Sequence, residues 1–561
     1  MKFNDLRDFK GDSLFQADLC IIGSGPAGLS IAKEFIGTKV NVLVVESGGH
    51  EEEVETQSLY DIENVGAPRY IQQDQVRNRI FGGTSHTWTG KCAPFDPIDF
   101  QKRDWIPHSG WPIQPSDLED YLDRARENLR LGSSCYDERL WKVFKVSSPY
   151  RFNSKLLKSQ FWQYSKVSKQ DRQPMRFGPY LIADANNISV LLHANVTHLN
   201  TDEQGTKLES VEISTLDKRV SLVRAKVVIL CCGGVENARL LLASNRIIKN
   251  GVGNKNDMVG RFLMDHPGSL LGTFDPKKSQ AISERFGSYF LKSSNDYNVY
   301  QHGLALAPEL QEKEQLLNAA AFLIEVAAED NPWNSFRRLK AVLRQRKLTK
   351  SACLDVLNVL RHLPFVLWGA YRFLVRGQPP IAKVDEMLLY SLVEQNPNPE
   401  SRVTLSDQKD LLGMPISKVN WQISDLEKRT VSRLAYLIDQ EFERLNLPKL
   451  KLSDWLSKDE DWRSNFIDRA HPTGTTRMSN HPEDGVVDPN CQVHELEGLF
   501  ISGSSVFPTT GHANPTLMIV AMAIRLADWL KATTFSSANQ ESQPLMVSDL
   551  QTSISTVRSV D

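Results

Sequence analysis

The stretch that decides the fold runs from Leu19 to Gly28 and reads LCIIGSGPAG. Its short apolar run ends in a glycine-rich turn, residues 29–37 (LSIAKEFIG) continue with helical spacing, and residues 41–47 (NVLVVES) form a second apolar run. This order predicts a strand, a tight turn, a helix and a second buried strand. A turn of the form G-x-G-x-x-G in that context is the fingerprint of a dinucleotide-binding βαβ unit.

Each glycine of the turn has a separate expected role. Gly23 permits the tight turn, Gly25 lets the backbone approach a pyrophosphate, and Gly28 lets the helix pack closely on the strand. Ala27 lies in the first helical turn, where free N–H groups face the anion. Glu46 ends the second strand and is placed to accept hydrogen bonds from ribose hydroxyls. The alternative is a structural βαβ turn without a ligand.

Three further segments favour FAD over NAD as the dinucleotide. Residues 80–88 (IFGGTSHTW) form a glycine-hinged loop suited to a flat ring system, and residues 194–196 and 231–234 follow apolar strands. Residues 503–505 precede the last helix and would anchor the far end of an extended cofactor. The residues expected to contact the cofactor are Gly23, Gly25, Ala27, Gly28, Glu46, Gly82, Gly83, Thr84, Ser85, Val196, Gly233, Gly503, Ser504, Asn514 and Thr516.

Composition and charge exclude several classes of protein. The 561 residues, 41% of them hydrophobic, are enough for at least two domains at roughly 150 residues each. Lys and Arg total 66 against 68 Asp and Glu, so no nucleic-acid partner is expected. The seven cysteines show neither CxxC pairs nor zinc-ligand spacing, which predicts reduced thiols and no metal site. The charged N-terminus lacks the apolar core of an export signal, so we expect a cytoplasmic protein.

Seven motifs occur in order along nearly the whole chain. They are GSGPAG (23–28), FGGTSHTWTG (81–90), CCGGVENARLLL (231–242), VGRFLMDHP (259–267), SRVTLS (401–406), HPTGTTRM (471–478) and GSSVFPTTGHANPT (503–516). Together they resemble the glucose-methanol-choline (GMC) oxidoreductases, most closely the branch with pyranose 2-oxidase and the bacterial fructose and gluconate dehydrogenases. The resemblance implies an α/β fold, with a discontinuous Rossmann-like FAD-binding domain and an α+β substrate-binding domain built on an antiparallel sheet.

The resemblance also implies the domain boundaries. The FAD-binding domain would comprise residues 1–95, 185–270 and 470–532, and the substrate domain residues 96–184 and 271–469, with a helical basic insertion at 333–376. The remaining residues, 533–561, are rich in Ser and Gln and lack apolar periodicity, which predicts a disordered tail.

By position, His471 matches the family's active-site histidine and Asn514 matches its partner. A histidine that takes the hydroxyl proton eases hydride removal from a carbinol carbon, and a pKa near the working pH is expected of it. Asn514 would donate to the developing alkoxide, or it would simply cap the helix that begins after Pro515. His512 lies two residues earlier, on the same side of an extended segment, and is either a further catalytic residue or a loop histidine bonded to the backbone.

One position departs from the related covalent flavoproteins. Their loop has a flavin-carrying histidine directly before the tryptophan, whereas here Thr87 stands before Trp88 and the histidine is His86. A slip of one residue in an extended loop turns His86 to the opposite face. We therefore expect FAD to be bound noncovalently.

The insertion is basic and amphipathic. Residues 337–350 contain seven basic residues and no acid, and the apolar run at 354–375 is broken by Arg361, Pro364 and Arg372, which excludes a transmembrane helix. Two interpretations stay open. The insertion is a helical lid or packing hairpin, or it contacts an anionic membrane or a partner redox protein.

The expected reaction is FAD-dependent oxidation of an alcohol group, on a sugar, aminosugar or polyol, to a carbonyl. Its partners would be a small-molecule alcohol substrate and oxygen or another electron acceptor. Three alternatives are a lyase that keeps FAD without redox turnover, an oxidoreductase that takes a hydrophobic alcohol at a membrane surface, and a nicotinamide-dependent reductase. The last is disfavoured because the chain has no second G-x-G-x-x-G before a βαβ unit.

Overall fold

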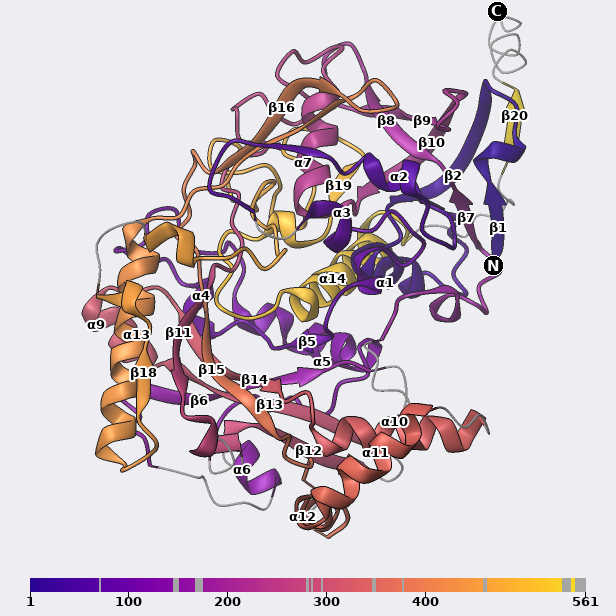
Figure 1. Cartoon of the computed structure of the whole chain (residues 1–561). Coiled ribbons are helices and arrows are strands. Elements are labelled where there is room, and N and C mark those ends of the chain that lie inside the picture. The colour runs from indigo at the N-terminus through magenta and orange to yellow at the C-terminus, as the bar shows by residue number, and fades with distance from the viewer. Residues whose placement is uncertain are drawn as a thin grey trace, which may run out of the picture.

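The computed structural model (Figure 1) describes residues 1–69, 72–144, 151–166, 175–278, 282–283, 286–293, 296–345, 350–375, 378–457, 462–536 and 546–549. Its strands gather into two large sheets and one small sheet. The long helix α13 (Asp425–Arg444) packs on the second large sheet, and the final long helix, α14 (Thr516–Thr533), packs on α1 (Pro26–Glu34) beside the first. The shorter helices are α2 (Val54–Ser58), α3 (Gln73–Val76), α4 (Pro97–Phe100), α5 (Glu119–Asn128), α6 (Leu140–Val143) and α9 (Pro308–Glu314).

The first sheet is built around the predicted βαβ unit. Strand β2 (Ser13–Ile22) leads through the glycine turn into α1 and on to β3 (Val42–Val45), which pairs with β2 in parallel. The strand order is β1-β7-β3-β2-β10-β9-β8, with β19 beside β10 and β20 beside β2. The other bounds are β1 (Lys2–Asp5), β7 (Ile188–Leu192), β8 (Asn195–Thr201), β9 (Leu208–Ser214), β10 (Val220–Leu230), β19 (Leu499–Ile501) and β20 (Met546–Asp549). Three distant stretches of chain therefore share one Rossmann-like sheet, as predicted.

The second sheet is antiparallel throughout its described pairings, which confirms the predicted α+β character of the substrate domain. Its order is β18-β11-β15-β14-β13-β6-β5, with β12 beside β13. The strands are β5 (Lys91–Cys92), β6 (Leu157–Tyr164), β11 (Gly268–Phe274), β12 (Ser288–Ser293), β13 (Asp296–Leu306), β14 (Ala319–Ala327), β15 (Val384–Val393) and β18 (Leu450–Leu452).

A small third sheet joins β4 (Ile62–Asn64) to β17 (Pro415–Asn420) and β16 (Arg402–Lys409). Strands β16 and β17 pack on α7 (Gly233–Ala243), the helix that follows β10 of the first sheet. Residues 402–420 were expected within the substrate domain. In the structure this segment instead extends to the cofactor side of the molecule.

The predicted disorder of residues 533–561 is wrong at 546–549. These residues form β20, which pairs antiparallel with β2 from Ser13 to Gln16. Strand β3 pairs only with the later half of β2, from Leu19 to Ile22, so the first half keeps backbone groups on that side for another strand. Helix α14 also runs on to Thr533. Tail residues 537–545 and 550–561 lie outside the described residues.

The basic insertion forms three helices, α10 (Pro332–Gln345), α11 (Lys350–Arg361) and α12 (Leu363–Leu374), between β14 and β15. They are grouped at one corner of the molecule, beside β12 and β13 (Figure 1). An ion pair from Arg338 to Asp355 joins α10 to α11, and Trp333 of α10 packs against Gly369 of α12. Among the described helices, none is long and apolar enough to span a bilayer.

Candidate active site

A cavity of about 830 Å³ lies where the two large sheets meet, with lining residues from both. This is within the size range of small-molecule and cofactor sites. The N-termini of α1, α7 and α14 all open onto it, through Gly25, Gly233 and Thr516. Helix N-termini present unpaired N–H groups and a partial positive charge, so the cavity suits an anionic ligand.

The glycine turn has the backbone geometry that the sequence predicts. Gly23 has a φ of +101°, and a Cβ there would lie 2.7 Å from the carbonyl oxygen of Cys231. A Cβ on Gly25 would meet nothing within 4 Å, so the backbone is open to the cavity at that point. A Cβ on Gly28 would lie 2.0 Å from the carbonyl oxygen of Gly23, which keeps the helix close to the strand.

Glu46 is buried at the end of β3 and lines the cavity. Its carboxylate accepts hydrogen bonds from the Ser24 backbone N–H at 3.0 Å, from the Ser24 hydroxyl at 2.6 Å and from the Gly48 N–H at 2.9 Å. These donors fix the carboxylate beside the glycine turn. The expected contact of Glu46 with a ribose stays a prediction.

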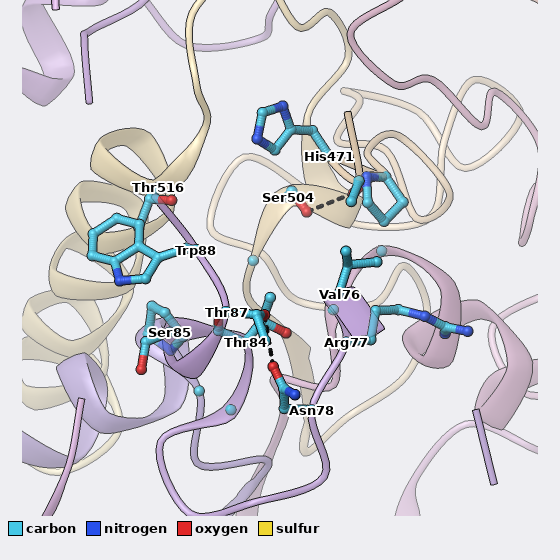
Figure 2. A pocket seen from close by; sticks show the side chains of 18 of the residues that line it. Val76, Arg77, Asn78, Thr84, Ser85, Thr87, Trp88, His471, Ser504 and Thr516 are labelled. Atoms are coloured by element: carbon cyan, nitrogen blue, oxygen red, sulfur yellow. Dashed lines mark hydrogen bonds between the residues drawn. The ribbon is translucent and has the colours of Figure 1, made fainter. Parts of the chain in front are cut away.

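The loop after Gly82 is a short 3-10 helix, from Gly83 to His86, and not the extended segment that was expected. His86 turns away from the cavity nevertheless, because its Nε2 lies 3.1 Å from the carbonyl oxygen of Phe81. Thr87 lines the cavity, and its hydroxyl donates to Asn78 Oδ1 at 2.8 Å (Figure 2).

Most of the predicted site residues meet in this one cavity. It is lined by Gly23, Gly25, Ala27, Glu46, Gly83, Thr84, Ser85, Val196, Gly233, His471, Gly503, Ser504, Asn514 and Thr516. Gly28, Gly82 and His512 do not line it. Gly28 and Gly82 shape the turns behind the lining, and Figure 2 shows His471 above Ser504, with Trp88 and Thr516 near by.

His471 is oriented by a second histidine, His266, to which the sequence analysis gave no role. The two Nδ1 atoms lie 3.1 Å apart, and His266 Nε2 lies 3.3 Å from the carbonyl oxygen of Thr510. Since a carbonyl only accepts, His266 Nε2 carries the proton, and its Nδ1 accepts one from His471. The Nε2 atom of His471 is then left without a proton. It lies 3.4 Å from Asn514 Nδ2, which can donate to it.

His266 is preceded by a buried carboxylate that holds the His471 backbone. Asp265 accepts from the backbone N–H groups of Arg469 and His471, and it pairs with Arg69 at 2.6 Å. Burial raises the pKa of Asp265, but Arg69 and the two histidines lower it further, so the carboxylate is ionised. The motif VGRFLMDHP contains both residues, and an Asp-His pair beside a glycine was the available signal for them.

The pKa of His471 is far from the working-pH value that was expected. Burial lowers it to about 3, and the nearby rings and cations of His266, Arg469 and Lys91 outweigh the opposing effect of Asp265. His471 is consequently neutral at every physiological pH. Its free Nε2 lone pair is available without a prior deprotonation step.

Asn514 is not a helix cap. Helix α14 has Pro515 at the cap position and no side-chain cap hydrogen bond. The local alternative for Asn514 is therefore wrong. Its amide lies near His471, at the cavity wall.

His512 does not share the orientation of Asn514. The chain bends at 512 and 513, so the two side chains do not alternate as in an extended strand. His512 is 2% exposed, packs edge-on against Trp162 and lies 3.5 Å from the Asp96 carboxylate. The structure does not bring His512 into the cavity with His471.

The comparisons with known proteins agree with this arrangement. Two family models described as GMC oxidoreductase match the chain, the N-terminal model over residues 162–268 and the C-terminal model over residues 397–523. The chain belongs to the GMC oxidoreductase family.

Three curated relatives of this GMC protein act on alcohols or sugars according to their names. It is 23% identical to 2-methyl-1,2-propanediol dehydrogenase of Mycolicibacterium austroafricanum, over 94% of this chain and 98% of the relative. Paromamine 6'-oxidase of Streptomyces fradiae is 22% identical, over 91% and 90%. The fructose dehydrogenase large subunit of Gluconobacter japonicus is 22% identical, over 62% of this chain and 54% of the subunit.

A solved structure shares the fold. Formate oxidase of Aspergillus oryzae RIB40, in a variant form, superposes with a TM-score of 0.53 at 18% identity, over 94% of this chain and 100% of the oxidase. Family membership implies FAD, and the cavity fits it. Gly25, Gly233 and Gly503 each leave open space where a side chain would stand, next to three helix N-termini.

Proposed function

We propose that this GMC oxidoreductase oxidises an alcohol group to a carbonyl, with His471 as the proton acceptor. The hydrogen bond between His266 and His471 supports this most directly, because it leaves the cavity-facing Nε2 of His471 unprotonated. When bound, the flavin of FAD supplies the acceptor for the hydride that leaves the carbinol carbon.

The chain's own residues would orient the alcohol and move its proton. The Asn514 amide donates to the substrate oxygen, which places the hydroxyl beside His471. His471 Nε2 then takes the hydroxyl proton, and His266 receives a hydrogen bond from the imidazolium that forms. Because Asn514 does not titrate, the oxygen keeps its donor throughout the reaction.

The substrate class that fits the relatives is a sugar, aminosugar or polyol, and the final electron acceptor is oxygen or another oxidant. A screen of alcohols and sugars on the purified holoenzyme, following flavin absorbance first without and then with oxygen, tests both points. A substrate bleaches the flavin without oxygen. The rate at which colour returns on adding oxygen separates an oxidase from a dehydrogenase.

We also propose that FAD is held without a covalent bond to the protein. Thr87 occupies the cavity-facing position before Trp88, and threonine has no ring nitrogen that could carry a flavin. His86 is turned away, toward a backbone carbonyl.

The insertion supports a second proposal, contact with an anionic membrane surface. Helices α11 and α12 expose a row of large apolar side chains that includes Leu357, Leu367 and Leu374, each at least 60% exposed. Residues 333–376 carry ten basic residues and one acid, Asp355, which is already paired with Arg338. Exposed apolar groups flanked by cations are the pattern of an interfacial helix on anionic lipid.

A further inference from the structure

Lys91 is a buried cation that the proposed chemistry does not use. It stands on β5, is 7% exposed and lines the cavity. Its ammonium lies 4.2 Å from the ring centre of Trp162 and 3.4 Å from that of Phe322. Among the described residues, no carboxylate pairs with it and no hydrogen bond reaches its Nζ. Burial holds the pKa of Lys91 well below its usual value, and Arg469 lowers it further.

Arg469 is a second cation of this kind. It also lines the cavity, and its guanidinium lies 4.2 Å from the ring centre of Tyr390. Its Nε is buried with no hydrogen-bond partner in the described part of the chain. The nearby carboxylates of Asp265 and Asp468 are both taken by Arg69. Within the residues that the structure describes, the guanidinium therefore has no counter-ion of its own.

The two cations stand over one face of the second sheet. Phe322 on β14 and Tyr390 on β15 are directly paired across the strands, with ring centres 6.3 Å apart. Paired residues on neighbouring strands point to the same side of a sheet. Lys91 and Arg469 rest on this aromatic pair, and both act electrostatically on His471.

Two enclosed cations without counter-ions are costly unless an anion joins them, because the rings beneath them return only part of their lost hydration. The flexible ammonium and the planar guanidinium together suit the oxygens of a carboxylate or phosphate. The cavity lining on this side includes aromatic residues, such as Tyr164 and Phe322, that would pack against a carbon skeleton.

We propose that Lys91 and Arg469 bind an oxyanion carried by the alcohol substrate, so that the substrate class is hydroxy acids, sugar acids or sugar phosphates. This inference rests on the proposed alcohol oxidation. The anion would anchor one end of the substrate, leaving a hydroxyl at the other end beside His471 Nε2.

Binding of inert anions tests the subsite without turnover. The FAD-containing enzyme is titrated with acetate and, separately, with inorganic phosphate, while the flavin spectrum is followed in wild type, Lys91→Met, Arg469→Met and the exposed control Lys451→Met. We expect saturable binding of one anion, weakened about tenfold or more in the first two variants and unchanged in the control. The better binder of the two distinguishes a carboxylate substrate from a phosphorylated one.

A proton-linked readout adds a second arm. If the anion raises the pKa of Lys91, affinity falls as pH rises, and Lys91→Met loses that dependence. Absence of saturable binding by either anion, or equal binding in all four proteins, overturns the proposal. A changed flavin reduction potential with unchanged anion affinity would assign the cations to the flavin instead and overturn it as well.

The outcomes also separate this subsite from the proposed function. If alcohols bleach the flavin but neither anion binds, the subsite is wrong and alcohol oxidation stands. If anions bind but no alcohol bleaches the flavin, alcohol oxidation is wrong.

Discussion

The two ring nitrogens of His471 differ because of what each one faces. Nδ1 faces His266, whose own proton is committed to the Thr510 carbonyl, and Nε2 faces Asn514 and the cavity. A lone imidazole in the same place would exchange tautomers freely. His266 is thus a positioning residue, which acts through His471.

Replacing His266 by Phe removes the acceptor for the His471 Nδ1 proton. We expect flavin reduction to slow by about tenfold, the value of one lost hydrogen bond, with FAD content and KM little changed. His266→Gln keeps a side-chain oxygen that can accept and should recover part of the rate. Stopped-flow reduction of the three proteins is the measurement. Equal rates for the His266→Phe variant and the wild-type enzyme would show that His471 needs no partner.

His471 itself should matter much more than His512. His471→Ala removes the base and should slow flavin reduction by about 100-fold or more. His512→Ala should leave the reaction step largely intact, because His512 faces Trp162 and Asp96 and not the cavity. A larger loss in the His512 variant would mean that the base is misassigned.

The lowered pKa of His471 also predicts a pH profile. A base with a pKa of about 3 is unprotonated above that value, and its activity is lost only as the pH falls through it. The limiting rate of flavin reduction should therefore stay flat from about pH 5 to about pH 9. A fall centred near the ordinary histidine pKa would place the protonation of His471 in the wrong range.

Thr87 predicts how the flavin leaves the protein. With no histidine at the cavity-facing position, acid precipitation should release all of the yellow colour into the supernatant. Denaturing electrophoresis should show no flavin fluorescence on the polypeptide. Flavin that stays with the precipitate would contradict noncovalent binding.

At the scale of elements, strand β13 carries a buried histidine with a cost at low pH. Both ring nitrogens of His302 lack partners among the described residues, and the ring packs against Phe161, Phe286 and Trp141. Burial lowers its pKa to about 3. An unfolded chain binds a proton at this residue below about pH 6.5, whereas the folded chain does not.

The stabilising contribution of neutral His302 is therefore complete above about pH 6.5 and is lost as the pH falls toward 3. At pH 5 the loss should be about 2 kcal/mol. Denaturant unfolding at pH 7.5 and pH 5 should show that His302→Phe removes this part of the acid sensitivity. The exposed control His481→Phe should keep it. Equal acid sensitivity in both variants would mean that His302 does not carry the effect.

Helices α11 and α12 carry the expected membrane contact. The enzyme should sediment with anionic vesicles, more weakly as salt rises, and little with neutral ones. Leu357→Asp combined with Leu367→Asp should abolish sedimentation. Ile247→Asp, at an exposed apolar residue outside the insertion, should not. No sedimentation of wild-type enzyme would leave a lid or a protein partner as the role of the insertion.

The elements that the sequence predicted well are those set by local pattern. The βαβ unit follows from apolar runs and three glycines whose backbone roles are separable. The bend at residues 512 and 513 and the 3-10 helix at 83–86 were missed, because both depend on what the loops pack against. Strand β20 was missed because its pairing uses an open stretch of β2 more than five hundred residues away.

At the scale of the whole molecule, the cavity is assembled from segments that are far apart in the chain. Residues near 23, 83, 233, 471 and 514 line one space, between a mostly parallel sheet and an antiparallel one. The motifs indicated these segments one by one. The partner of His471 and the two unpaired cations emerged only from the assembly, since charge and hydrogen bonding there depend on neighbours that are hundreds of residues distant.

The central claim is that a hydride leaves a carbinol carbon while His471 takes the hydroxyl proton. Anaerobic stopped-flow reduction of the holoenzyme, with a substrate found in the screen and its form deuterated at the carbinol carbon, tests this most directly. We predict that the substrate bleaches the flavin, that deuterium slows the bleaching, and that His471→Ala, with FAD still bound, does not bleach at a comparable rate. Flavin that stays oxidised with every alcohol and sugar tested, while the protein still converts one of them, would contradict the claim and indicate non-redox chemistry.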